Sequence, residues 1–235
     1  MIYDILNNKK TRKIAILIDP DKQQAASVQK TIASCEQCHV DLILVGGSLD
    51  AGNSDELIKS IKVQTPIPIV LFPGSLLQLS DKADGIFLLS LISGRNPEYL
   101  IGNHVQAAPM LKKSKIEVIS VGYILIESGR STSVQYMSNT MPIPADKPDI
   151  AVATAIAGEM LGLKAIYLEA GSGAQFHVPE KVISAVKEQI NIPLIVGGGI
   201  RTKDQLDSIF NAGADLVVIG NSLENNPAKL FTLLS

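Results

Sequence analysis

The chain of 235 residues has no tryptophan, only two cysteines and few aromatic residues, 4% of the total. Two cysteines cannot form the set of disulfides that holds many small secreted domains together. The hydrophobic residues, 46% of the chain, supply enough apolar side chains for an ordinary packed core. The fold therefore needs neither disulfides nor a structural metal for its stability.

The chain also lacks a charge excess and any long hydrophobic run. Its 21 basic and 23 acidic residues leave a net charge of −2, which argues against a nucleic-acid partner held by bulk charge. No apolar stretch approaches the roughly 18 residues of a membrane-spanning helix, and the polar segment 1–12 has no apolar signal core. We expect a cytoplasmic protein without a transmembrane segment. These features do not exclude contact with a membrane surface.

Several motifs are missing. The sequence has no Gly-x-Ser-x-Gly, no Walker loop and no Gly-x-Gly-x-x-Gly after its first strand, and its three histidines share no metal-binding spacing. Cys35-Glu-Gln-Cys38 before His39 has the spelling of a haem-attachment or dithiol motif. It lies at the end of a predicted helix, where cysteine usually packs as a small apolar residue. We interpret both cysteines as packing residues.

Short runs of apolar residues recur along the whole chain and alternate with helical patterns. The predicted strands are 13–18, 41–45, 67–72, 85–89, 116–121, 165–168, 194–196 and 216–219. The predicted helices are 24–37, 55–63, 97–112, 150–161, 179–189, 203–211 and 226–234, with only a weak pattern at 75–80. No linker divides them. The alternation predicts an α/β protein with a single (β/α)8 barrel domain over residues 1–235, its third helix weak or missing; a doubly wound open sheet is the alternative.

A long irregular segment, 127–148, interrupts this regular alternation. It is rich in serine, threonine, glycine and proline. Connections of this length inside a compact domain are usually lids or binding loops. We expect the segment to border a functional site.

Glycines follow the last three predicted strands, at 171–173, 197–199 and 220. In a barrel these positions share the face where the carboxyl ends of the strands meet and where active sites form. Glycine leaves backbone N–H groups bare, and such groups bind phosphate. The cluster predicts a phosphate-binding cup, although each glycine by itself could serve only a tight turn.

Acidic residues occupy the same predicted face. Asp19 and Asp21 follow the first strand and Ser48 follows the second, so that they could bind magnesium, which prefers oxygen ligands. The aspartates could equally cap the following helix. Glu169 ends the sixth strand, where it could act as a general base for a substrate hydroxyl or merely orient a loop through hydrogen bonds.

At these residues the chain resembles the geranylgeranylglyceryl phosphate synthase family, which includes the bacterial heptaprenylglyceryl phosphate synthases. The resemblance covers nearly the whole length. It rests on five motifs in order: Leu17-Ile-Asp-Pro-Asp-Lys22, Val45-Gly-Gly-Ser48, Tyr167-Leu-Glu-Ala-Gly-Ser-Gly173, Val196-Gly-Gly-Gly-Ile200 and Val218-Ile-Gly-Asn221. The last two motifs alone would fit many phosphate-binding barrels.

The resemblance implies a prenyltransferase that joins sn-glycerol 1-phosphate to a polyprenyl diphosphate, geranylgeranyl in particular, through an ether bond and releases diphosphate. It implies Mg²⁺ at Asp19 and Ser48, and Glu169 as the acid that contacts the glycerol hydroxyls. One branch of the family has a lysine two positions before the aspartate, where this chain has Leu17. Members commonly form homo-oligomers, here a dimer or a hexamer. The glycerol-phosphate cup would comprise Tyr167, Leu168, Glu169, Ala170, Gly171, Ser172, Gly173, Gly198, Gly199, Gly220 and Asn221.

A prenyl tail would need a long apolar groove, for which strands four and five and the residues just after them supply candidates. Each of these residues could instead be ordinary barrel core. The candidates are Leu88, Leu89, Leu91, Ile92, Val121, Tyr123 and Ile124.

Two other functions stay open. One is a phosphate-binding barrel enzyme of another kind, such as an isomerase or aldolase of sugar phosphates. Such an enzyme needs a Schiff-base lysine or two facing acids, and Lys22 is the only lysine near the carboxyl end of a predicted strand. The other is a barrel that binds a phosphorylated metabolite without turnover.

Overall fold

The computed structural model describes residues 1–21, 25–47, 54–220 and 228–234 of the chain. Eight parallel strands pair in chain order, and β1 pairs with both β2 and β8, so the sheet closes into a barrel. The predicted barrel is thereby confirmed. The strands are β1 (Lys13–Ile18), β2 (Leu42–Val45), β3 (Ile69–Leu71), β4 (Gly85–Leu91), β5 (Glu117–Leu125), β6 (Ala165–Glu169), β7 (Leu194–Gly197) and β8 (Leu216–Ile219).

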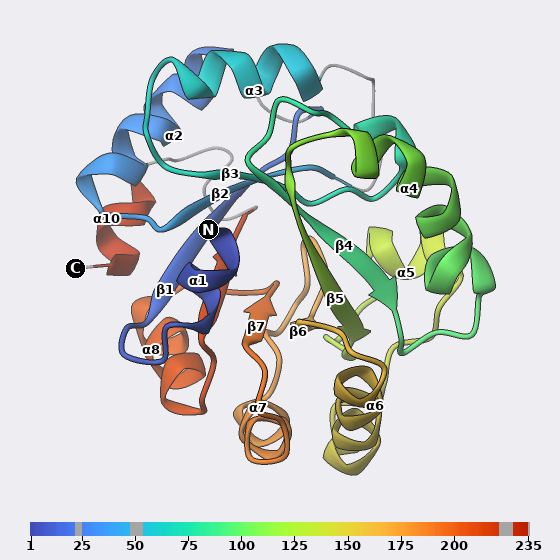
Figure 1. Ribbon diagram of the computed structural model, residues 1–235. Helices are drawn as coiled ribbons and strands as arrows, with labels where there is room; N and C mark the ends of the chain where they lie inside the picture. Colours follow the sequence, from blue (N-terminus) through green and yellow to red (C-terminus); the bar gives the residue numbers. More distant parts are fainter. Residues whose placement is uncertain (22–24, 48–53, 221–227, 235) are drawn as a thin grey trace.

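Helices surround the barrel, as Figure 1 shows. Most begin and end within a few residues of their predicted bounds, because their apolar side chains recur at helical spacing. The helices are α1 (Ile2–Asn7), α2 (Ala25–Gln37), α3 (Ser54–Lys62), the 3₁₀ turn η1 (Leu76–Gln78), the π-helical turn η2 (Glu98–Gly102), α4 (Asn103–Lys113), α5 (Ser133–Ser138), α6 (Pro148–Met160), α7 (Glu180–Lys187), α8 (Lys203–Asn211) and α10 (Lys229–Leu234).

The barrel has two apolar cores, because successive side chains of a strand point to opposite faces. The inner core fills the barrel and includes Phe87, Val121 and Tyr167. The outer core joins the strands to the helices and includes Ile166 and Leu168. The neighbours Tyr167 and Leu168 thus belong to different cores, and the site lies above the inner one.

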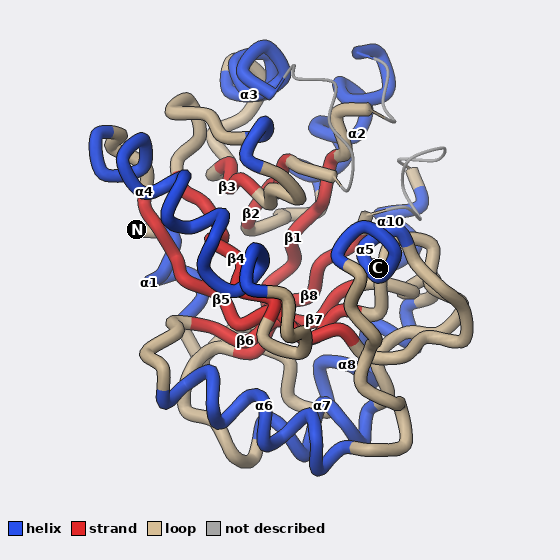
Figure 2. The backbone as a smooth tube through the Cα atoms, turned by 90° about the vertical axis from the view of Figure 1, so that its right-hand side faces the viewer, coloured by secondary structure: helices blue, strands red, loops and turns tan. Residues whose placement is uncertain are grey.

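The amino-terminal end of the barrel is closed by α1, a helix that was not predicted from the sequence. Its side chains Ile2 and Leu6 are buried in the inner core, and the Glu117 carboxylate accepts hydrogen bonds from the first backbone N–H groups of the helix, Ile2 at 2.6 Å and Tyr3 at 3.0 Å. Two buried residues in a six-residue helix are too few for a periodic signal. Figure 2 shows α1 and α5 at opposite ends of the barrel.

Three aspartates at this closed end join neighbouring strands by the same contact. Each aspartate directly precedes an even-numbered strand. Its Oδ2 accepts a hydrogen bond from a backbone N–H at the start of the preceding odd-numbered strand. The pairs are Asp41 with Ile14 N at 2.8 Å, Asp84 with Ile69 N at 2.8 Å and Asp215 with Leu194 N at 2.7 Å. The corresponding residue before β6 is Lys164, so the β5–β6 pair has no such carboxylate.

Buried Lys13 lies beside this end of the barrel. Its ammonium donates to the backbone oxygens of Asn8 and Thr11, and burial lowers its pKa while Asp215 and Asp41 raise it. The charges at the amino-terminal end therefore serve strand register and closure.

Two connections depart from the regular alternation of strands and helices, and the sequence predicted one of them better than the other. The weak third helix is confirmed, because only η1 lies between β3 and β4. The long segment 127–148 is less irregular than expected: it contains α5, and Ile143 forms a parallel bridge with Ile126 beside the end of β5.

The two cysteines are free thiols. Cys35 is fully buried in α2, and burial raises its pKa to about 12. Its burial is the packing that the sequence predicted.

Candidate active site

A cavity of about 310 Å³ opens at the carboxyl ends of the strands. One part is polar and glycine-rich and lies over β6, β7 and β8, with Asp19 after β1. The other part is mostly apolar, although Asn103, His104 and Ser138 also line it, and it extends toward β4, η1, α4 and α5. A single cavity thus offers a polar compartment and an apolar compartment that meet at Glu169.

Glu169 is the buried carboxylate of this cavity. It ends β6 and is only 7% exposed, and burial raises its pKa above the ordinary value of 4.5. The backbone N–H of Gly171 donates to Glu169 Oε1 at 2.5 Å, and the hydroxyls of Tyr123 and Tyr167 also bond to the carboxylate; these bonds lower the pKa and oppose the effect of burial. A carboxylate so held is oriented and is poised to accept a proton.

The two tyrosines belong to an aromatic cluster directly beneath this carboxylate. The ring centres of Tyr123 and Tyr167 lie 5.2 Å apart, and that of Phe72 lies 5.3 Å from Tyr167. The register of β5 and β6 pairs Tyr123 with Tyr167, so the two hydroxyls approach Glu169 from adjacent strands. Since Tyr123 was expected only in an apolar groove, its contact with Glu169 is a role that the sequence did not indicate.

The glycines beside Glu169 are required by close packing. A Cβ on Gly197 would lie 2.1 Å from the Tyr167 hydroxyl, and one on Gly198 would lie 2.5 Å from Glu169 Oε1. Gly199 has a φ of +74°, and its Cβ would lie 2.4 Å from the backbone oxygen of Phe176. The loops after β6 and β7 are therefore in direct contact, and only glycine fits between them.

Asp19 faces the glycine loops from β1. It is 7% exposed and lines the cavity, and its Oδ1 accepts a hydrogen bond from Asp21 N at 3.1 Å. A Cβ on Gly47 would lie 2.6 Å from this same oxygen, so Gly47 makes room for the carboxylate. The described residues contain no cluster of three or more acidic, histidine or cysteine side chains that could hold a metal on their own.

The apolar compartment includes part of the expected groove. Leu88, Leu89, Leu91 and Tyr123 line the cavity. The other three candidates do not: Val121 is in the inner core, Ile124 is in the outer core, and Ile92 packs against the outer core. Those three are core residues, which was the alternative considered for each.

Most residues expected in the cup do meet at the cavity. Its lining includes Tyr167, Glu169, Gly171, Ser172, Gly173, Gly198, Gly199 and Gly220. The Leu168 side chain instead lies in the outer core, and Ala170 lines a second cavity of about 250 Å³ on the other side of Glu169. Ser48 and Asn221 lie outside the described residues.

Two cavity-lining residues and one residue that supports a loop of the cavity had no signal in the sequence. Arg201, which follows the glycine run, and Lys229 in α10 both line the polar compartment. Gln78 in η1 is 1% exposed and fixes the loop that carries Gly47: its Nε2 donates to Gly47 O at 2.9 Å, and its Oε1 accepts from Gly74 N at 2.8 Å. Its side chain connects the loops after β2 and β3, where a regular third helix is missing. Isolated polar residues on loops and at helix ends follow no period, so only tertiary contacts identify them.

A (β/α)8 barrel with glycine loops after β6 and β7 and a buried carboxylate between them belongs to the class of barrel enzymes that bind phosphorylated substrates at the ends of their last strands. The chain belongs to the PcrB family, whose model matches residues 3–234.

Relatives with curated names agree with this family. A geranylgeranylglyceryl phosphate synthase of Chitinophaga pinensis is 50% identical, over 97% of this chain and 92% of that protein. One of Pyrococcus furiosus is 42% identical, over 92% of this chain and 86% of that protein. The similarity extends over almost the full length of each protein.

Solved structures give the same result. The geranylgeranylglyceryl phosphate synthase of Thermoplasma acidophilum, in complex with its substrate sn-glycerol-1-phosphate, superposes with a TM-score of 0.92 at 36% identity, covering 98% of this chain and 95% of that one. An N-acetylmannosamine-6-phosphate 2-epimerase from Clostridium perfringens has a TM-score of 0.61 at 15% identity and shares the fold alone.

No helix among the residues that the structure describes has both the length and the apolar character needed to span a membrane.

Proposed function

We propose that this protein is a prenyltransferase that forms an ether bond between sn-glycerol 1-phosphate and geranylgeranyl diphosphate, with release of diphosphate. One observation carries the proposal: Glu169, a buried carboxylate with a raised pKa, lies where a glycine-lined polar compartment meets an apolar one. A small phosphorylated acceptor and a long apolar donor require that combination. The full-length relatives named for this reaction, one of them bound to the acceptor, support the assignment.

Backbone N–H groups would bind the acceptor substrate, glycerol phosphate. The N–H groups of the loops after β6, β7 and β8 would bind the phosphate group of glycerol phosphate without needing a full positive charge. Gly198, which lies against Glu169, joins the phosphate cup to the carboxylate. The substrate hydroxyl would then lie at Glu169, which takes its proton as the oxygen attacks the allylic carbon of the donor.

The remaining cup residues have supporting roles in this proposal. Tyr167 holds the Glu169 carboxylate, while Gly171, Ser172, Gly173, Gly199 and Gly220 form the cavity wall around the phosphate. Leu168 and Ala170 act through their backbone, because their side chains point away from the main cavity. Asn221 completes the cup in the proposal, although it is not described.

The donor diphosphate would face Asp19, with Mg²⁺ between them. The donor set fits this ion: Mg²⁺ is commonly held by one or two carboxylates together with substrate phosphates and water, and Gly47 leaves space at the Asp19 oxygen where a side chain would clash. When bound, the ion would neutralise charge that develops on the leaving diphosphate. Ser48, expected as a second ligand, lies outside the described residues. Leu17, which replaces the lysine of the other branch, lines the cavity beside Gly220 and brings no charge there.

The prenyl tail would occupy the apolar compartment. Leu88, Leu89 and Leu91 offer it one wall from β4, and Val134 and Met137 another from α5. Burial of each CH₂ group contributes about 0.8 kcal/mol, so a long tail is a large source of binding energy. The loop 127–148, expected to border the site, supplies this second wall through α5.

A product assay tests the proposal. Purified protein is incubated with sn-glycerol 1-phosphate, Mg²⁺ and equal concentrations of C15, C20 and C35 diphosphates, and the ether products are separated. We expect the C20 product to dominate and EDTA to abolish it until Mg²⁺ is restored in excess. Failure to form any prenylglyceryl phosphate would reject the function, while binding of glycerol phosphate without turnover would favour a non-catalytic barrel.

We further propose a cytoplasmic homo-oligomer, a dimer or a hexamer, that releases its lipid product at a membrane surface. Among the residues that the structure describes, thirteen large hydrophobic side chains are substantially exposed, including Tyr136 of α5 at 84% and Met141, just after α5, at 84%. Exposed apolar side chains of this kind are compatible with a covered surface. Light scattering of the purified protein measures the molar mass directly. A monomeric mass at micromolar concentration would contradict the proposed assembly.

A further inference from the structure

The loops after β6 and β7 form one unit, although they are separate in sequence. Phe176 O and His177 N lie 2.4 Å and 2.7 Å from the position of a Cβ on Gly199. The two loops contribute Gly171–Gly173 and Gly198–Gly199 to the cavity wall. Whatever fixes one loop against the other therefore determines the shape of that wall.

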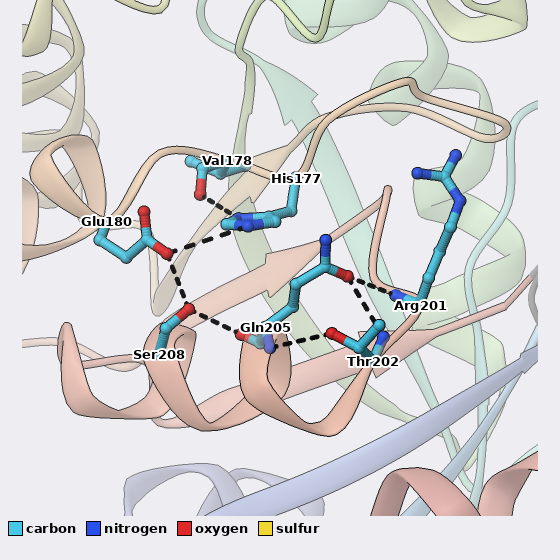
Figure 3. A network of polar contacts seen from close by, with 7 residues as sticks. All are labelled: His177, Val178, Glu180, Arg201, Thr202, Gln205 and Ser208. Carbon is cyan, nitrogen blue, oxygen red and sulfur yellow. Dashed lines mark hydrogen bonds and ion pairs between the residues drawn. The ribbon is translucent and has the colours of Figure 1, made fainter.

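Polar contacts behind the wall join the helices that follow the two loops (Figure 3). Glu180, in the first turn of α7, accepts a hydrogen bond from Ser208 of α8 at 2.7 Å. Thr202 caps α8 in a capping box with Gln205. Gln205 Oε1 also accepts a hydrogen bond from the backbone N–H of Arg201 at 2.8 Å. The start of α8, and with it the backbone of Arg201, is thus held in place.

The Arg201 side chain reaches from this fixed backbone to the other loop. Its Nη2 donates to Ala174 O at 2.5 Å and its Nη1 donates to Gln175 O at 2.8 Å. A planar guanidinium with a fixed fork of donors suits two adjacent carbonyl oxygens. Ala174 directly follows Gly171–Gly173, so the fork holds the carboxyl end of that glycine loop.

We infer that Arg201 is a positioning residue of the phosphate cup: its guanidinium clamps the loop after β6 onto the loop after β7 and so presets the two sets of glycine N–H groups. The inference rests on the proposed function for the identity of the ligand. The clamp itself consists of contacts to backbone oxygens, so it acts before any ligand binds.

Amide hydrogen exchange of the ligand-free protein tests the clamp directly. Ala174 N donates to Gly171 O, and Gln175 N and Phe176 N donate to Ser128 O, so these three amides report whether the loop stays closed. In Arg201→Met we expect their exchange to quicken by at least tenfold, with the strand amides unchanged. Arg201→Gln, which keeps one side-chain NH2 group that can donate to a carbonyl, should give an intermediate rate.

Arg12→Met is the matched control, because Arg12 also contacts α8, at Asn211 and Asp207 near its carboxyl end. Exchange at 174–176 should match wild type in this variant. Unchanged exchange in Arg201→Met would overturn the inference.

Steady-state kinetics then connect the clamp to the cup. We expect Arg201→Met to raise KM for glycerol phosphate about tenfold, to leave kcat within about threefold and to leave KM for the prenyl diphosphate unchanged. Arg201→Gln should raise KM for glycerol phosphate less than Arg201→Met does. If the charge of Arg201 instead contacted the phosphate directly, Arg201→Lys would keep a low KM and Arg201→Gln would not. Recovery by lysine alone would overturn the inference. If wild type neither binds nor converts glycerol phosphate, the proposed function fails, while the exchange result still decides the clamp.

Discussion

The two ends of the barrel use carboxylates and glycines in opposite ways. At the amino-terminal end, Asp41, Asp84 and Asp215 each accept a backbone N–H of the preceding strand, and α1 covers the opening. At the carboxyl end, glycines replace side chains and leave space, and Glu169 is held in a buried place that raises its pKa. At one end the carboxylates join neighbouring strands through hydrogen bonds, and at the other end glycines and a buried carboxylate shape a cavity. This division is typical of (β/α)8 barrels, in which function lies at the carboxyl face.

The sharpest test of this comparison is Glu169→Gln. We expect kcat to fall by about 10²–10⁴-fold, the range of a lost general base. Stability should be retained or increased at neutral pH. Because burial raises the folded-state pKa of Glu169, the wild type loses stability as pH rises from 4.5 through that raised pKa, and glutamine removes this loss. Turnover and thermal unfolding measured between pH 4 and 8 check both parts. Turnover like that of wild type would remove Glu169 from the base role.

Asp215→Ala tests the other end. Its carboxylate accepts hydrogen bonds from Leu194 N at 2.7 Å and from Lys187 Nζ at 2.5 Å, and its charge also favours the charged form of buried Lys13. Loss of hydrogen bonds to a charged group should cost about 2–3 kcal/mol of unfolding free energy. Activity per folded molecule should not change. Urea unfolding with kinetics at 25 °C measures both.

The control for that variant is Asp207→Ala. Asp207 is a half-exposed acid, 3.5 Å from Arg12, and its loss should cost less than about 1 kcal/mol. A large loss of glycerol phosphate binding in Asp215→Ala without a loss of stability would contradict the division between the two ends.

Alanine substitutions at two glycines of the carboxyl end compare a strained position with one that has room for a side chain. Gly199→Ala introduces a Cβ 2.4 Å from Phe176 O at a φ of +74°, whereas Gly220→Ala introduces one 3.5 Å from Leu17 Cβ, an ordinary contact. We expect Gly199→Ala to lose roughly 1–3 kcal/mol of stability through backbone strain and to raise KM for glycerol phosphate about tenfold. Gly220→Ala should unfold within about 0.5 kcal/mol of wild type, as for a substitution without strain. Equal stability of the two variants would show that the loops have room to move apart.

The smallest expected effect is that of Tyr123→Phe. The Tyr123 hydroxyl bonds to Glu169 and lowers the pKa of the carboxyl group, so its removal should raise that pKa further. Since the ionised carboxylate is the base, the acidic limb of the kcat profile should move to higher pH by less than about one unit. Activity at pH 8 should change little. A shift to lower pH would mean that the hydroxyl stabilises the protonated form.

Much of the barrel was predictable because its strands are local apolar runs, most of which end in glycine or an acid. Segments 13–18 and 216–219 agree with β1 and β8 in full, but β5 continues to Leu125, four residues beyond its prediction. The continuation Gly122-Tyr-Ile-Leu125 pairs with β6, a contact that no local pattern reveals. The helix α1 was missed because its two buried residues gain their burial only from the completed barrel.

The sequence by itself determined the order of strands and helices, the glycines at the strand ends, and Asp19 and Glu169 as the acids of one face. These follow from periodicity and from the rule that parallel strands end at a common edge. Only the tertiary structure decided which side chains meet there: Tyr123 at Glu169, Gln78 at Gly47 and Arg201 at the loop after β6. The reason is physical. Side-chain hydrogen bonds between residues far apart in the chain depend on three-dimensional distance, which a one-dimensional pattern does not contain.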